Sequence, residues 1–334
     1  MTGVLQNTGR YAPAVLRSLQ GLFAVYKPPG VHWKLVRDAV ETNLLKDLNS
    51  LKHPAPRKQV RFLLGGGEGR ESSSTELALT AATLPVLADH PLVKGPNYTQ
   101  LKVGAGHRLD VKSSGVFVLG LGYGTKLLTN MYNANFTKDY TVCGLFGKAT
   151  DDFSDTGRLV EKTTYDHIIR DKLERILAVI QGTHQKALLA YSGVDLKSQE
   201  AYELAVEGLL RPLDKSPPII TGIRCLHFAP PEFTLQIQCL NETQQYLRKV
   251  VHEIGLELKS SAVCTHVRRT RDNFFGLDDA LLRTHWNLDN ILKAIEDSRL
   301  RVETELKKLD LQDTVTDSGE GWRQLESTAG ADLL

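Results

Sequence analysis

The feature that most constrains the fold is an apolar run, GVFVLGLG, at residues 115–122. Successive residues of a strand point to opposite faces, and here both sets of positions lack charged and polar side chains. Such a run predicts a strand that is buried on both faces. The chain must therefore supply further layers to cover both sides of the sheet that holds this strand.

Periodic patterns elsewhere supply those layers. Strands are predicted at residues 21–27 and 140–147, and residues 219–240 are typical of a hairpin whose second strand alternates apolar and polar side chains. Asn241 and Gln244 form a candidate capping pair for the helix that follows. Helical spacing of apolar residues predicts helices at 35–49, 124–133, 169–180 and 242–258. Together these elements predict an α+β fold with a mixed, largely antiparallel central sheet and flanking helices.

The 334 residues are expected to hold one large domain at residues 21–295. Residues 1–20 contain two arginines and no acid, which is typical of a mitochondrial leader; a disordered terminus is the alternative. Residues 52–75 are rich in Pro, Gly and Ser, which predicts a loop or an insertion that is mobile. Residues 296–334 are expected to finish a helix and continue as an acidic, disordered tail.

Charge is distributed unevenly along the chain. The formal net charge is only +2, but the first 67 residues hold ten Lys or Arg and three Asp or Glu, while the chain after Lys308 is acidic. This asymmetry fits a body that binds a polyanion; a solvated surface is the alternative.

Cysteine spacing and hydropathy exclude several classes of protein. The four cysteines form no CxxC pair and no zinc-type spacing, so we expect reduced core thiols and no metal site. No apolar run approaches the roughly 20 residues that a membrane-spanning helix needs.

The densest group of chemically useful side chains lies at residues 106–115, just before the buried strand. Asp110 is on a glycine-bounded loop at a strand mouth, where catalytic groups are often found. His107 and Arg108 flank it and can hold it ionised. The alternative is an ordinary surface aspartate in a polar loop.

Three further features are candidates for RNA contact or catalysis. Tyr140 can stack on a base, although a tyrosine in a strand is often simply part of the core. Arg248 lies beside the apolar stripe of its helix and can pair with a carboxylate, or it can extend toward solvent. The basic cluster at residues 267–271 can contact phosphate, or it can be a solvated loop.

The combination of these features resembles the TruB family of pseudouridine synthases over about residues 21–290. The turn at Lys27, Pro28 and Gly30 is similar to the turn after that family's opening strand. The matching motifs are Leu109, Asp110, Gly115 and Val116; Tyr140, Gly147, Thr150, Asp151, Asp155 and Gly157; Tyr191, Ser192 and 201–205; Tyr246 and Arg248; and Val267, Arg268, Arg269 and Thr270. They occur in the family's order, and the resemblance implies the sheet of the pseudouridine synthase type.

The resemblance also implies roles. Asp110 would attack a flipped-out uridine, either at carbon 6 of the base or at the sugar, and Arg248 would orient this aspartate. Tyr140 would stack on the uracil and take a sugar proton, and Val267 would press on the base from its other side. The residues implied in substrate binding are His107, Arg108, Val267, Arg268, Arg269 and, as support for the pocket, Lys27. No cofactor and no metal is implied.

The sequence departs from the family in two places. Ala105 stands where many TruB enzymes have a histidine, so His107 or Arg108 is expected to fill the space of the flipped base. The order His-Arg-Leu-Asp resembles the RluA family instead. No PUA domain is recognised in residues 296–334, which are all that follow the core.

The resemblance therefore implies a synthase of the mitochondrial matrix that acts on RNA, with mRNA favoured over tRNA or rRNA, and it admits mitochondrial RNA-granule proteins as partners. The alternatives are an RNA-binding scaffold or assembly factor that keeps the fold, and an RluA-type synthase. A glycosidase is disfavoured because no second carboxylate accompanies Asp110.

Overall fold

The computed structural model describes residues 11–65, 78–194, 197–206, 210–212 and 216–307. The chain divides into two compact units. One contains Glu41–Leu101 together with the chain up to Ser18, and the other contains Leu19–Val40 together with the chain from Lys102 onward. The parts of the predicted leader and tail at residues 1–10 and 308–334 lie outside the described residues.

The larger unit is built on a mixed sheet. Among the described residues its nine strands are β1 (Gly21–Lys27), β4 (Val103–Ala105), β5 (Ser114–Leu121), β6 (Lys138–Phe146), β9 (Ile219–Ala229), β10 (Glu232–Leu240), β11 (Ala262–Asp272), β12 (Phe275–Gly276) and β13 (Ala280–Leu281). Their order is β13-β1-β5-β11-β6-β10-β9, with β4 paired to β5 and β12 to β11. The β1–β13 and β5–β11 pairings are parallel and the others are antiparallel, which confirms the predicted fold class.

Strand β5 is the centre of this unit. All of its residues are buried, as the apolar run predicted. Antiparallel pairing with β1 and parallel pairing with β11 hold it inside the sheet. Its side chains join one core cluster, whose buried members are Leu22, Ala24, Val116, Val118, Leu128, Met131, Phe275 and Val302.

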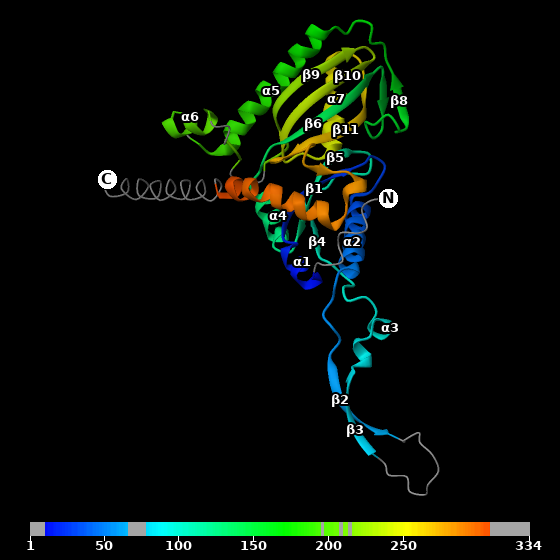
Figure 1. Cartoon of the computed structure of the whole chain (residues 1–334). Helices are drawn as coiled ribbons and strands as arrows, with labels where there is room; N and C mark the ends of the chain where they lie inside the picture. Colours follow the sequence, from blue (N-terminus) through cyan, green and yellow to red (C-terminus); the bar gives the residue numbers. More distant parts are fainter. Residues whose placement is uncertain (1–10, 66–77, 195–196, 207–209, 213–215, 308–334) are drawn as a thin grey trace, which may run out of the picture. The chain divides into compact units, whose positions relative to one another are not determined.

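Several helices accompany the sheet. They are α4 (Gly124–Asn133), α5 (Arg170–Ser192), α6 (Gln199–Val206), α7 (Gln244–Glu257) and a helix at 288–307, and the first part of α2 (Trp33–Ser50) also belongs to this unit. Helix α5 runs along β9 and α7 packs against β11, while α4 packs against β1 and β5 (Figure 1). A small separate sheet pairs β7 (Lys148–Thr150) with β8 (Leu159–Lys162).

Several predicted element ends need correction. Helix α4 has the predicted bounds, but α5 continues to Ser192. The Asn241–Gln244 capping pair is wrong: Thr243 caps α7, and its hydroxyl accepts a hydrogen bond from the Tyr246 amide at 3.2 Å. Strand β6 begins before Tyr140, because the alternating burial already starts at its first residue.

The smaller unit holds the segment that the sequence predicted to be a loop. Strands β2 (Lys58–Gly65) and β3 (Ala78–Pro85) form an antiparallel hairpin, accompanied by α1 (Ala12–Ser18) and α3 (Pro91–Lys94). The loop prediction is therefore wrong at 58–65, where Val60 and Phe62 alternate with polar residues and favour a strand. Residues 53–57 of the predicted insertion have no regular secondary structure, and its part at 66–75 lies outside the described residues.

Gly115 allows β5 to approach β11 closely. Its φ is 114°, and a Cβ at this position would collide with the backbone nitrogen and oxygen of Arg269. Only glycine accepts both this backbone conformation and this contact without strain. Because Gly115 pairs with Arg269, the loop that carries Asp110 is held at the edge of β11.

Candidate active site

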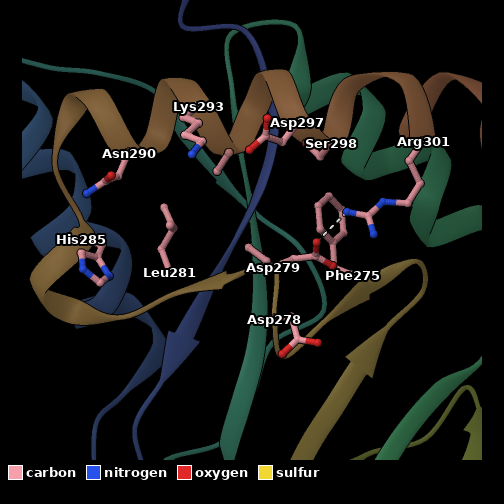
Figure 2. Close-up of a pocket in the computed structure, with 12 residues that line it drawn as sticks. Phe275, Asp278, Asp279, Leu281, His285, Asn290, Lys293, Asp297, Ser298 and Arg301 are labelled. Carbon is pink, nitrogen blue, oxygen red and sulfur yellow. Dashed lines mark hydrogen bonds and ion pairs between the residues drawn. The ribbon is translucent and has the colours of Figure 1, made fainter.

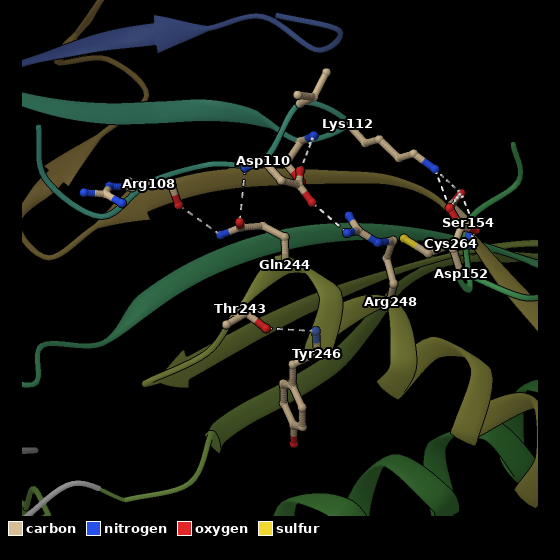
Figure 3. A network of polar contacts seen from close by, with 12 residues as sticks. Arg108, Asp110, Lys112, Asp152, Ser154, Thr243, Gln244, Tyr246, Arg248 and Cys264 are labelled. Carbon is tan, nitrogen blue, oxygen red and sulfur yellow. Dashed lines mark hydrogen bonds and ion pairs between the residues drawn. The ribbon is translucent and has the colours of Figure 1, made fainter. Parts of the chain in front are cut away.

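The loop that carries Asp110 is clamped by the first turn of α7. The Asp110 amide donates a hydrogen bond to Oε1 of Gln244 at 3.2 Å, and Nε2 of Gln244 donates to the Arg108 carbonyl at 3.4 Å (Figure 3). The Ser113 amide donates to Oδ1 of Asp110 at 2.8 Å. A residue far away in the sequence, Gln244, therefore fixes the backbone at Arg108 and Asp110, and the local contact from Ser113 fixes the turn that follows.

Arg248 meets this carboxylate from the same helix. Its Nη2 lies 2.7 Å from Oδ2 of Asp110, and the two side chains are 12% and 32% exposed. Gln244 and Arg248 are four residues apart on α7, so both face the loop. The ion pair that the sequence predicted is present.

The environment keeps Asp110 ionised. Burial raises the pKa of this carboxyl, but hydrogen bonds from Ser113 and Arg248 and the Arg248 charge outweigh burial, so the net pKa is lowered. Nη1 of Arg248 is buried without a hydrogen-bond partner among the described residues. A charged, partly exposed carboxylate beside an unused donor can act on a bound substrate.

Lys27 supports the Asp110 loop from inside the protein, through its buried ammonium group. It is fully buried, and its Nζ donates to the carbonyls of Ser113 at 2.6 Å and Pro28 at 3.1 Å. Burial lowers the pKa of Lys27 to about 8, while the nearby Asp110 charge opposes this. A lysine in this position braces the backbone and does not reach a substrate, so the supporting role fits and direct substrate binding does not.

Tyr140 is held away from solvent. The residue is fully buried, and its hydroxyl donates to Oε1 of Glu242 at 2.6 Å, beside the Lys138–Glu242 ion pair. Burial, reinforced by the Glu242 charge, raises the pKa of Tyr140 well above its usual value. The phenol therefore keeps its proton in this structure, which does not support removal of a sugar proton by it; stacking on uracil stays a prediction.

The basic cluster is part of β11 and not a solvated loop. Arg269 is fully buried: Nε donates to the Val116 carbonyl at 2.8 Å, and Nη2 donates to the His107 carbonyl at 2.7 Å and lies 3.1 Å from Asp272. Contact of this guanidinium with phosphate is therefore excluded in this conformation, and Arg269 instead joins the Asp110 loop to the sheet. Asp272 was not singled out from the sequence.

The other two predicted residues of β11 differ in exposure. Val267 is 1% exposed, whereas Arg268 is partly exposed and its guanidinium carbon lies 5.6 Å from the ring centroid of Tyr26. Contact of Arg268 with a substrate stays a prediction that its partial exposure allows. Pressure of Val267 on a bound base stays a prediction.

His107 and Arg108 point to different surroundings. Nδ1 of His107 lies 3.2 Å from Asp272, and its ring stacks on Tyr132 at 4.4 Å. Arg108 is exposed, with its guanidinium carbon 4.8 Å from the ring centroid of Trp33. Arg108 is therefore the more available of the two for the space left by a flipped base.

One contact beside Asp110 was missed by the sequence analysis. Nζ of Lys112 lies 2.6 Å from Oδ2 of Asp152, 2.7 Å from Ser154 and 2.9 Å from Thr156 (Figure 3). These acceptors lie between β7 and β8, so this Lys112 strap ties the Asp110 loop to a second loop. The acid-rich stretch at 151–155 was the only signal for it in the sequence.

A cavity of about 300 Å³ lies away from these residues, between the β12–β13 segment and the helix at 288–307 (Figure 2). Asp279 and Arg301 are already paired across it at 2.7 Å. None of the predicted site residues lines this cavity. Among the described residues, no group of three or more His, Cys, Asp or Glu side chains is arranged to hold a metal ion.

The fold and the Asp110–Arg248 pair are those expected of a pseudouridine synthase. Residues 96–245 match the family model described as "TruB family pseudouridylate synthase (N terminal domain)". The chain is 66% identical to "Pseudouridylate synthase TRUB2, mitochondrial" of Xenopus tropicalis over 88% of this chain and 90% of that protein. It is also 66% identical to the Homo sapiens protein of the same name, over 88% of each chain. The chain therefore belongs to the TruB family, and it is an RNA pseudouridine synthase.

One solved structure, described as "Crystal structure of the archaeal box H/ACA sRNP Nop10-Cbf5 complex", aligns with 84% of this chain and 60% of that chain. The TM-score is 0.44 and the sequence identity is 17%. Within the described part of the chain, no helix combines the length and apolarity needed to cross a membrane.

Proposed function

We propose that Asp110 is the catalytic carboxylate, and that the chain converts uridine to pseudouridine in mitochondrial mRNA, within the matrix. The observation that carries the catalytic assignment is the 2.7 Å ion pair between Asp110 and Arg248. A carboxylate with a lowered pKa that is 32% exposed is both charged and accessible. These are the two properties that a nucleophile or a base needs.

The reaction conserves every atom of the uridine. The bond from the sugar to ring nitrogen 1 breaks, a bond from the sugar to ring carbon 5 forms, and the proton lost from carbon 5 is balanced by one gained at nitrogen. Asp110 acts either on carbon 6 of the base or on the sugar. Because the net change is an isomerisation, the balance requires no external oxidant or reductant.

The remaining residues divide into those that reach the RNA and those that hold the site. Arg108 fills the space that the flipped base leaves, and Arg268 contacts the RNA backbone, since both are at least partly exposed. Lys27 and Arg269 are fully buried and hold the Asp110 loop. Arg248 orients the carboxylate and keeps it charged.

The choice of RNA and compartment rests on relatives. The similar proteins of Xenopus tropicalis, Homo sapiens and Mus musculus carry "mitochondrial" in their names, and each shares about two thirds of its aligned residues with this chain. The resemblance described above favours mRNA. Mitochondrial RNA-granule proteins are the proposed protein partners, since they would bring this RNA to the enzyme.

The central test compares purified wild type with Asp110→Ala and Asp110→Asn on uridine-containing RNA, with pseudouridine measured by mass spectrometry. Both variants should lose product, whereas a matched control, Asp166→Ala at an exposed aspartate of the same unit, should not. Equal yields from wild type and Asp110→Ala would overturn the catalytic assignment.

The RNA and its location are tested separately. Pseudouridine should disappear from mitochondrial mRNA when a cell's own protein is replaced by Asp110→Ala, and the wild-type protein should fractionate with the matrix. Loss confined to tRNA or rRNA would contradict the mRNA proposal. Full rescue of a knockout by Asp110→Ala would favour the scaffold alternative.

A further inference from the structure

An aromatic ring surrounded by cations lies next to the Asp110 loop. Trp33, the first residue of α2, is partly exposed. The ring centroid lies 4.8 Å from the Arg108 guanidinium carbon, 5.7 Å from that of Arg37 and 5.8 Å from Nζ of Lys34. An indole is the best aromatic partner for a cation, and these distances are within the range for attraction.

The ring is held in place from the core side. Phe117 of β5 is fully buried and meets Trp33 in an edge-on contact, with ring centroids 6.4 Å apart and planes at 66°. The platform therefore stands on the most buried strand of the unit. A ring that is fixed in this way loses little side-chain freedom when a ligand stacks on it.

The three cations have only one acid among them. Arg37 pairs with Asp38 at 2.7 Å, while no carboxylate of the described residues lies within ion-pair distance of Arg108 or Lys34. An aromatic face with surplus positive charge suits a ligand that has both a flat ring and a negative backbone. A single-stranded nucleic acid combines these properties in each nucleotide.

The platform is coupled to the catalytic loop through Arg108. This residue is two positions before Asp110, and Gln244 binds the Arg108 carbonyl as well as the Asp110 amide. Consecutive Cα atoms are about 3.8 Å apart, so the backbone atoms of Arg108 and Asp110 lie close together. An RNA segment that meets both Asp110 and the Arg108 side chain would bring a nucleotide that flanks the target uridine to Trp33.

We propose that Trp33 is a stacking platform for an unpaired base that flanks the target uridine, with Lys34 and Arg37 binding the phosphates of that segment. The base replaces the Arg108 guanidinium on the indole face, and Arg108 turns toward the RNA. This proposal rests on the proposed function, because it takes Asp110 as the position of the target uridine.

The first test measures pseudouridine formation by Trp33→Ala, Trp33→Phe and wild type on an RNA that the wild type modifies. Stacking on an aromatic side chain contributes roughly 1–3 kcal/mol per base, which corresponds to about a 5- to 150-fold rise in KM for Trp33→Ala. We expect kcat to change much less, and Trp33→Phe to recover most of the affinity. An unchanged KM in Trp33→Ala would overturn the proposal.

A matched control is Tyr123→Ala. Tyr123 is 57% exposed and belongs to the same unit, but it follows the far end of β5, a whole strand away from the Asp110 loop. Its loss should leave KM unchanged. Thermal unfolding of all variants checks that any change in KM does not reflect a damaged fold.

The second test removes bases from the RNA. Abasic nucleotides are placed one at a time around the target uridine, and KM is measured for wild type and Trp33→Ala. At one flanking position the abasic RNA should penalise wild type about as much as Trp33→Ala does, and the two changes together should cost no more than either alone. Losses that multiply at every position would refute stacking on a base.

The two proposals fail in different ways. If wild type forms pseudouridine, Asp110→Ala does not, and Trp33→Ala matches wild type, the catalytic assignment stands and the platform is refuted. If wild type forms no pseudouridine, the proposed function fails. Binding of fluorescently labelled RNA, with and without abasic sites, then still decides whether Trp33 holds a base.

Discussion

Replacing Arg248 by alanine tests the electrostatic basis of the site. The guanidinium donates one hydrogen bond at 2.7 Å to a carboxylate that is 32% exposed. A hydrogen bond to a charged group contributes roughly 1.5–3 kcal/mol, and partial exposure places this pair toward the lower part of that range. We therefore expect kcat/KM of Arg248→Ala to fall about 10- to 100-fold at neutral pH.

The change in pH dependence gives the sharper readout. Arg248 helps to hold the pKa of Asp110 below its usual value, while burial acts in the opposite direction. Without Arg248, the hydrogen bonds from Ser113 still counter the effect of burial, which raises the pKa, but the hydrogen bond and charge of the arginine are lost. The folded-state pKa of Asp110 therefore rises. The acid limb of kcat/KM should therefore move to higher pH in Arg248→Ala, and less so in Arg248→Lys, which keeps the charge.

The assay is the initial rate of pseudouridine formation across a pH series at constant ionic strength. Lys249→Ala is the matched control, because Lys249 is 55% exposed on the same helix and pairs with Glu253 on its surface. Its acid limb should coincide with that of wild type. An acid limb in Arg248→Ala that also coincides with wild type would refute the role of the ion pair.

Three further changes test how the loop is held. Asp272→Asn should lower the free energy of unfolding by about 3–5 kcal/mol in urea titrations, because it leaves Arg269 buried without a counter-charge. Burial raises the pKa of Asp272, but the Arg269 charge and the hydrogen bond and charge of His107 together outweigh burial and lower this pKa to about 2. The stabilisation by Asp272 should therefore be present above the unfolded pKa of about 3.9 and be lost as pH falls toward 2; a pH-independent difference between wild type and variant would contradict this. Lys112→Met should leave the melting temperature nearly unchanged but lower kcat, because the Lys112 strap is exposed yet adjoins Asp110; an unchanged kcat would contradict a positioning role. Gly115→Ala should cost more than about 1 kcal/mol in the same titrations, because its φ of 114° and the nearby Arg269 backbone admit no Cβ; wild-type stability would refute this.

Much of the fold could be predicted because it rests on local patterns. The apolar run of β5, the helical spacing of α4 and the alternation in β10 are properties of short segments, and the structure has each of these elements. The hairpin β2–β3 was missed because Pro, Gly and Ser dominate the residues that flank β2. Within β2, Val60 and Phe62 alternate with polar residues, and this short signal for a strand was overlooked.

The site was predictable only where a motif carried it. The Asp110–Arg248 pair was found through its resemblance to a family, since nothing local joins two residues that far apart. The partners that decide the chemistry of the other residues were missed, above all Glu242 for Tyr140 and Asp272 for Arg269. Partner identity is a property of tertiary packing, so residue types alone did not distinguish a phosphate-binding arginine from a buried one.

The parallel pairing of β5 with β11 has a consequence for synthesis of the chain. Residues that meet there, such as Val116 and Arg269, are separated by 153 positions, so β5 emerges from the ribosome long before its neighbour exists. Until then a fully apolar strand has an unsatisfied hydrogen-bonding edge, which is a template for aggregation. A nascent chain with Asp110 but without α7 and β11 also lacks Arg248 and Gln244, which hold the carboxylate and its backbone, so enzymatic competence should appear only after both elements have been synthesised.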